Sequence, residues 1–248
     1  MEAAVAKGQI RGGRGSQQDA AEWLQWEPGC FLMVLADGIG GMAGGEVASR
    51  VAVDGFCKSF MESDHTEMPT RLREALTEAN KAVYHRKKEV PDLAEMGTTL
   101  IGAAIENGKL SWISVGDSPL WLIREGRMHR LNENHSVGGL LDMRAAAGEI
   151  TSEEAEQSTR RHILLEAIQG LDLQYVDAPT EPTQLVKSDT VIVASDGVET
   201  CSEEELAEIT TAGRPSAADI VGAILDAIDT YKKPYQDNAT LIVHKPRF

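Results

Sequence analysis

Four aspartates lie beside short apolar stretches whose composition is typical of buried strands. Residues 31–36 lead into Asp37, residues 112–115 lead through Gly116 into Asp117, residues 190–195 lead into Asp196, and Asp237 stands just before the stretch 239–243. Because strands end at the edges of a sheet, such side chains can converge from distant parts of the chain. Packed carboxylates repel one another unless a cation lies between them, and all-oxygen ligand sets suit Mg²⁺, Mn²⁺ or Ca²⁺ rather than zinc. The pattern indicates a metal-dependent enzyme.

Composition narrows the class of protein further. The 248 residues are 42% hydrophobic, enough for a proper core, and the net charge of −15 argues against a nucleic-acid partner or an anionic membrane surface. Cys30, Cys57 and Cys201 are widely spaced and form no CxxC pair, so neither structural zinc nor a disulfide framework is expected. No apolar stretch approaches the roughly 18–20 residues needed to cross a bilayer. We expect a cytoplasmic protein.

The order of elements favours a single α+β domain over residues 1–248. Apolar spacing predicts helices over 44–62, 70–88 and 216–231, and strands over 30–36, 98–105, 110–115, 119–123, 189–195 and 239–244. Tight turns between the central strands indicate antiparallel pairing. Residues 136–182 are less regular, with one short helix capped by Thr151 and Glu154. Strands and helices do not alternate, which favours a layered sandwich over a doubly wound parallel sheet.

Each candidate motif also has a simpler interpretation. The glycines around Asp37 allow a tight turn in which the Gly38 carbonyl joins the carboxylate as a ligand, but Asp37 could equally cap a helix. The Asp117, Asp196 and Asp237 segments could be ordinary turns. Arg14, five residues before Asp19, can present a planar fork to an oxyanion, or can be a solvated surface arginine. Together, at strand ends, the aspartates favour the metal-binding interpretation.

Other catalytic patterns are missing from the sequence. It contains no GxSxG, no GxxxxGK[ST], no histidine pair with ligand spacing and no DxDxDG calcium loop. The residue two positions after Asp37 is Ile39 rather than the second aspartate that an aspartyl-phosphate phosphatase needs. A catalytic metal site remains the interpretation that the residues favour.

The motifs in their order resemble the metal-dependent protein serine/threonine phosphatases (PPM, type 2C), most closely the bacterial branch. The resemblance spans residues 8 to 244 and rests on Arg14 with Asp19, residues 36–41, 97–99, 116–118, 195–197, and Asp237 with Asn238. The segment 133–170 resembles the part of these enzymes that contains a flap. Each motif is short, and six in the right order are specific.

The resemblance implies a four-layer α/β/β/α sandwich, with two central antiparallel sheets flanked by helices and metals at one end. Asp19, Asp37, Asp196, Asp237 and the Gly38 carbonyl would hold two Mg²⁺ or Mn²⁺ ions, Asp117 with Asp196 would match a third position, and Arg14 would bind phosphate. Arg14 and Asp37 are thus the expected catalytic residues. Three departures from the family pattern are Gln17-Gln18 before Asp19, Ile39 where many eukaryotic members have a histidine, and Pro119 where bacterial relatives often have arginine.

The implied reaction is hydrolysis of phosphoserine and phosphothreonine in proteins by a metal-bridging hydroxide. With Ile39 apolar, no side chain is assigned as the general acid. Phosphorylated proteins, such as the targets of serine/threonine kinases in signal transduction, are the expected partners of a monomeric enzyme. The alternatives are a catalytically silent regulator that binds phosphoproteins through the same fold, and a structural Ca²⁺ module.

Overall fold

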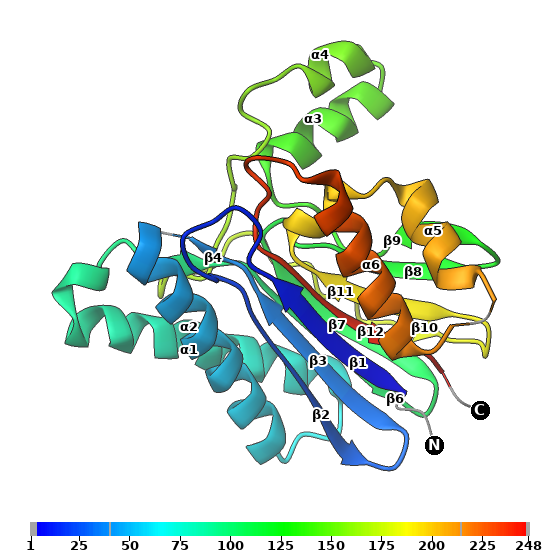
Figure 1. The fold of residues 1–248 in the computed structure, drawn as a ribbon. Coiled ribbons are helices and arrows are strands. Elements are labelled where there is room, and N and C mark those ends of the chain that lie inside the picture. The colour runs from blue at the N-terminus through cyan, green and yellow to red at the C-terminus, as the bar shows by residue number, and fades with distance from the viewer. Residues whose placement is uncertain (1–3, 40, 214, 247–248) are drawn as a thin grey trace.

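A computed structural model describes residues 4–39, 41–213 and 215–246, apart from the side chains of residues 41–43. Within these ranges, neighbouring strands pair antiparallel in two five-stranded sheets and one small two-stranded sheet (Figure 1). The first large sheet has the order β1 (Val5–Ile10), β12 (Ala239–His244), β11 (Thr190–Ala194), β8 (Leu120–Arg124), β9 (Arg127–Arg130). The second has the order β10 (Thr183–Gln184), β7 (Lys109–Val115), β6 (Leu100–Glu106), β3 (Cys30–Ala36), β2 (Ala20–Glu27). The small sheet pairs β4 (Gly38–Ile39) with β5 (Gly97–Thr98).

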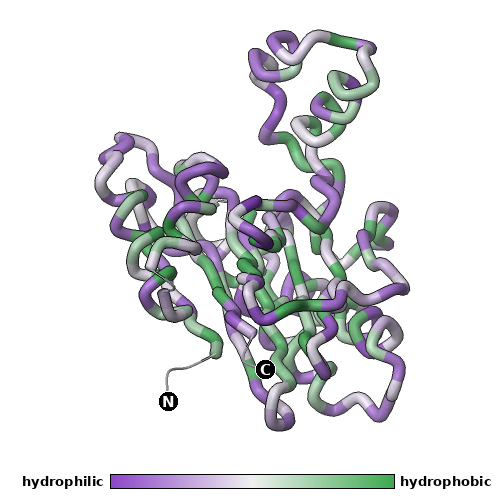
Figure 2. Tube along the Cα trace, turned by 90° about the vertical axis from the view of Figure 1, so that its right-hand side faces the viewer, coloured by the Kyte–Doolittle hydropathy of each residue, from purple (hydrophilic) through white to green (hydrophobic). Residues whose placement is uncertain are grey.

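Helices cover the outer faces of the two large sheets (Figure 1). The second sheet carries α1 (Gly41–Glu62) and α2 (Met68–Glu89), and the first carries α5 (Glu203–Thr211) and α6 (Ala217–Tyr231). Two 3₁₀ turns, η1 (Pro91–Leu93) and η2 (Asp196–Thr200), follow α2 and β11. The remaining pair, α3 (Val137–Ala146) and α4 (Ser152–Glu156), projects beyond one end of the sandwich in both Figure 1 and Figure 2.

The alternation of side chains along each strand builds the layers. In β3, Leu32 and Val34 pack against α1 and α2, whereas Met33 and Leu35 pack against strands of the other sheet. A strand buried on both faces therefore reads as one continuous apolar run, which explains why residues 30–36 carry no polar side chain. The expected α+β fold with two antiparallel sheets between helices is confirmed.

Most predicted elements agree with the structure to within a few residues. The face of α2 that contains Leu72, Leu76, Ala79 and Val83 is buried as expected. In α6, the predicted core residue Leu225 is only partly buried. The capping box of Thr151 and Glu154 opens α4, with hydrogen bonds in both directions.

The helix α3 is the longest element that the sequence pattern does not predict, and β2 and β9 are also missing from the predicted strands. Two glycines, Gly138 and Gly139, lie in its first turn and lower helix propensity. Leu140 and Met143 are exposed, so the helix lacks the buried apolar stripe from which a helix is recognised.

Three further observations bear on the expected class. The three cysteines are free. No helix in the described part of the chain has both the length and the apolar character to cross a bilayer. That residues 1–248 form one domain with a flap near 133–170 stays a prediction.

Candidate metal centre

The predicted site residues converge at the end of the sandwich from which α3 and α4 project. A cavity of about 700 Å³ lies there. Its lining includes Arg14, Asp37, Gly38, Asp117, Asp196 and Asp237. The remaining predicted ligand, Asp19, is buried beside them, with 7% of its surface exposed. Residues from five distant parts of the sequence thus meet as predicted.

Asp37 is fixed through its backbone, which leaves its carboxylate directed at the cavity. Its N–H donates to Thr99 Oγ1 at 2.9 Å. Its carbonyl oxygen accepts from Thr98 Oγ1 at 2.7 Å and from the N–H of Thr99 at 2.8 Å. The two threonines come from β5 and the residue after it, so pairing with a second segment sets the direction in which Asp37 leaves β3.

Gly38 occupies a position where no side chain fits. A Cβ there would lie 2.2 Å from the carbonyl oxygen of Gly45 and 2.6 Å from that of Gln18. Close approach of three backbone segments therefore requires glycine, independently of any role as a ligand. Gly40, which belongs to the same predicted motif, lies outside the described residues.

Asp19 is tied to the first sheet by a serine. Ser195 Oγ donates to Asp19 Oδ2 at 2.8 Å and accepts from the N–H of Thr240 at 3.0 Å. The other carboxylate oxygen, Asp19 Oδ1, is buried and has no hydrogen-bond partner, and the same holds for Asp196 Oδ1. Unpartnered buried anionic oxygens are costly, and a cation offsets that cost.

Burial and mutual repulsion raise the pKa values of these carboxyl groups. Burial is the main cause of the raised pKa of Asp37, and the charges of Asp19 and Asp196 raise it further. Burial, then the charges of Asp117 and Asp237, raises the pKa of Asp196 to about 7. A divalent cation would reverse this balance by favouring the ionised forms.

Asp237 and Arg14 form an ion pair across the cavity mouth. Arg14 Nη2 lies 2.5 Å from Asp237 Oδ2, and 54% of the arginine side chain is exposed.

In the described ranges, no three His, Cys, Asp or Glu side chains are arranged to hold one ion by themselves. If Asp237 bound a metal ion, its carboxylate would give up its ion pair with Arg14. The Arg14 guanidinium would then be available to bind an oxyanion. The site fits Mg²⁺ or Mn²⁺ for three reasons: its donors are all oxygens, two buried carboxylate oxygens have no partner, and the backbone approaches closely at Gly38.

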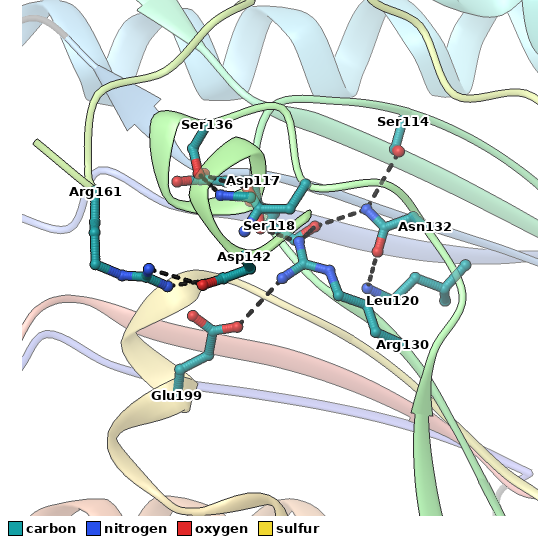
Figure 3. A network of polar contacts seen from close by, with 12 residues as sticks. Ser114, Asp117, Ser118, Leu120, Arg130, Asn132, Ser136, Asp142, Arg161 and Glu199 are labelled. Carbon is teal, nitrogen blue, oxygen red and sulfur yellow. Dashed lines mark hydrogen bonds and ion pairs between the residues drawn. The ribbon is translucent and has the colours of Figure 1, made fainter. Parts of the chain in front are cut away.

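The loop that carries Asp117 joins β7 to β8 and is held from several sides (Figure 3). Gly116 has φ +100°, in the region that favours glycine. Ser118 Oγ and Thr99 Oγ1 share a 2.7 Å hydrogen bond. The carbonyl oxygen of Gly116 accepts from the N–H of His135 at 3.0 Å. Asp117 is therefore more than a turn residue, because this bonding fixes it at the cavity wall.

Sequence reasoning did not assign some of the residues that line the cavity. His162, Leu164, Leu165 and Glu166 line it, all within the segment predicted to contain the flap. Ser195 and Asn238 were also not assigned roles of their own. Asn238 Nδ2 donates to the carbonyls of residues 11 and 16, which shapes the loop that carries Arg14. The only local signal for Ser195 and Asn238 is their place directly beside a predicted aspartate.

Comparison with known proteins identifies the family. The family model described as protein phosphatase 2C matches residues 9–233, so the chain belongs to the protein phosphatase 2C family. The resemblance found in the motifs is thereby confirmed. The serine/threonine phosphatase stp of Listeria welshimeri is 29% identical over 216 residues, which cover 86% of this chain and 83% of that protein. The stp protein of Listeria monocytogenes is 33% identical over 183 residues, 72% and 71% of the two chains.

Solved structures agree in fold. The serine/threonine phosphatase PstP/Ppp of Mycobacterium tuberculosis has a TM-score of 0.83 at 24% identity, covering 98% of both chains. The PPM phosphatase MsPP of Mycobacterium smegmatis, in complex with cacodylate, has a TM-score of 0.78 at 27% identity, again covering 98% of both. A PstP catalytic domain that matches with a TM-score of 0.79 and 24% identity was crystallised with two manganese ions. The roles of individual residues in the present chain stay predictions.

Proposed function

We propose that this protein removes phosphate from phosphoserine and phosphothreonine in proteins, with Mg²⁺ or Mn²⁺ as cofactor. The observation that carries the proposal is the gathering of Asp19, Asp37, Asp196 and Asp237 at one cavity, two of them with buried oxygens that no protein group satisfies. Membership of the protein phosphatase 2C family and the manganese-bound PstP structure support it.

The residues of the cavity divide into two tasks. Asp19, Asp37, Asp196, Asp237 and the Gly38 carbonyl would hold two ions, and Asp117 with Asp196 a third. Bound divalent ions would supply a water molecule of lowered pKa as nucleophile and would neutralise charge on the phosphate. Arg14, at the mouth, binds the phosphate through its planar fork once Asp237 is engaged elsewhere.

The leaving serine or threonine oxygen must gain a proton. Ile39 lines the cavity beside Asp37 and Gly38 and offers none. The cavity mouth is accessible enough that 54% of the Arg14 side chain is exposed. We therefore assign this proton to solvent and to no protein side chain.

The finer assignments belong to the same proposal. The substrates are targets of serine/threonine kinases, and the protein acts as a monomer in the cytoplasm, in a single domain. The net charge of −15 supports a protein substrate rather than a nucleic acid or an anionic membrane.

Asp37→Asn provides the test of this function. Hydrolysis of a phosphothreonine peptide is measured by phosphate release with Mn²⁺ and with EDTA, for wild type, Asp37→Asn and the control Asp226→Asn, whose side chain is exposed on α6. We expect activity in wild type and the control with Mn²⁺, and no turnover with EDTA or in Asp37→Asn. Wild-type turnover in Asp37→Asn would refute the metal assignment. Peptide binding without turnover in wild type would instead identify a silent phosphoprotein-binding regulator.

A further inference from the structure

A partly buried arginine connects two of the segments that carry aspartates of the cavity. Arg130 is the last residue of β9, and 23% of its side chain is exposed. Its Nη2 donates to the carbonyl oxygen of Asp117 at 2.5 Å and lies 3.5 Å from that of Ser118. Its Nη1 lies 3.4 Å from Glu199 Oε1 (Figure 3). One guanidinium thus spans from the Asp117 loop to η2.

The contact with η2 bears directly on Asp196. Asp196 is the first residue of this 3₁₀ turn, and Glu199 follows three positions later. Residues three apart in a 3₁₀ helix lie on the same side of it. The contact with Glu199 therefore adds a restraint on the rotation of the turn that carries Asp196 at the cavity. The same guanidinium fixes the peptide unit of Asp117.

The choice of atoms indicates positioning rather than neutralisation. An arginine that served to neutralise Asp117 would pair with its carboxylate. The guanidinium of Arg130 instead donates to the Asp117 carbonyl oxygen, and Asp117 lines the same cavity as Asp196. Asn132 reinforces the loop, because its Nδ2 donates to the carbonyl of Ser118 at 2.9 Å and its Oδ1 accepts from the N–H of Leu120 at 2.8 Å.

A second arginine in the same hairpin shows the contrast. Arg124 in β8 pairs with both carboxylate oxygens of Asp189, which is fully buried, and with the carbonyl of Gln184. None of these three residues lines the cavity. Arg124 supports the sheet, whereas Arg130 connects two cavity segments, so Arg124 offers a matched control.

We propose that Arg130 is a positioning residue that holds Asp117 and Asp196 at the separation needed for one divalent ion to bind between them. The inference rests on the proposed function, since it refines which residues of that site hold an ion. The fork of arginine is required, because the ammonium of lysine is a single point charge that cannot span the Asp117 carbonyl and the Glu199 carboxylate together.

Manganese binding without substrate tests this assignment. Free Mn²⁺ is followed by electron paramagnetic resonance during titration of wild type, Arg130→Met, Arg130→Lys and Arg124→Met, and kcat and KM for a phosphothreonine peptide are measured beside it. In wild type we expect tightly bound Mn²⁺ ions and one Mn²⁺ ion that binds with lower affinity, called the weaker ion below. Groups that orient metal ligands typically contribute about 10- to 100-fold in affinity, so Arg130→Met should weaken binding of the weaker ion by that factor. The tightly bound ions should weaken less, because Asp196 is only one of their several proposed ligands.

The variants separate positioning from general support. Arg130→Lys should not restore the weaker ion, and kcat should fall in both Arg130 variants with little change in KM. Arg124→Met should lower the melting temperature but keep all ions. If Arg130→Met fails to fold, Glu199→Gln takes its place and should weaken the same ion by a smaller factor.

Several results would overturn the inference. One is a manganese isotherm of Arg130→Met that equals that of wild type. Another is a loss of affinity for the weaker ion in Arg124→Met that equals the loss in Arg130→Met. A third is a wild-type protein that binds only the tightly held ions. A wild-type protein that binds no Mn²⁺ and releases no phosphate would instead sink the proposed function itself.

Discussion

Replacing Asp196 by asparagine should stabilise the metal-free protein while it removes activity. Asp196 is an anion in a desolvated cavity beside Asp117 and Asp237, and its pKa is raised from 3.8 to about 7. A carboxyl group whose pKa is raised by folding binds its proton more tightly in the folded state. Stability from this group is therefore present at low pH and is lost as the pH rises from about 4 to about 7.

The magnitude follows from the pKa difference. Each pKa unit corresponds to about 1.4 kcal/mol, so at pH 8 the ionised Asp196 costs about 4 kcal/mol in the absence of metal. Asparagine removes this electrostatic cost, but its amide has few hydrogen-bond partners in the cavity. The unsatisfied amide destabilises the folded state by about 2 kcal/mol. We expect a net rise in the free energy of unfolding of about 2 kcal/mol, or about 5 °C in melting temperature for a chain of this size.

Calorimetric melting at pH 8 in EDTA measures this change, with Asp189→Asn as the control. Asp189 is more deeply buried than Asp196 but pairs with Arg124, so neutralising it should destabilise the protein by about 2 kcal/mol. Neutralising these two aspartates thus has predicted effects of opposite sign on stability. Added Mn²⁺ should raise the melting temperature of wild type more than that of Asp196→Asn. A lower melting temperature for Asp196→Asn than for wild type in EDTA would refute the electrostatic reasoning.

Three further predictions address the phosphate, the backbone and the core. Arg14→Ala should lower kcat/KM about tenfold or more through the loss of a charge-assisted hydrogen bond, with manganese binding intact by calorimetric titration; unchanged kinetics would remove Arg14 from the site. Gly38→Ala should abolish Mn²⁺ binding in the same titration, because its Cβ would lie 2.2 Å from the Gly45 carbonyl oxygen. Normal Mn²⁺ binding by this variant would contradict the claim that the metal site requires glycine at this position. His244 is buried against Phe31, and burial lowers its pKa to about 4. The free energy of unfolding should therefore fall by about 3 kcal/mol as the pH drops from 6.5 to 4. Urea unfolding of His244→Leu should lack this decline.

The sequence predicted those parts of the site that have a local cause. An apolar run that ends in Asp37 and Gly38 marks a strand end, and the glycine that the backbone requires is visible in the sequence itself. Asp196 follows β11 and is itself followed by a glycine that the backbone requires, and Asp237 stands two residues before β12. Strand ends collect at a sheet edge, so the convergence follows from the topology.

The parts that could not be predicted depend on contacts between distant segments. Arg130 stands in an unremarkable polar strand, and nothing local indicates that it holds the Asp117 carbonyl and Glu199. The cavity wall at Leu165 depends on where the segment after α4 returns to the sandwich. The helix α3 has no buried stripe, because it projects from the body, so periodicity could not reveal it.

Anomalous diffraction from crystals grown with MnCl₂, recorded at the manganese edge, tests the central assignment most directly. We predict manganese peaks inside the cavity, within coordination distance of the carboxylates of Asp37, Asp196 and Asp237. Peaks confined to the outer surface, in crystals of a protein that hydrolyses phosphopeptides in the same solution, would contradict it.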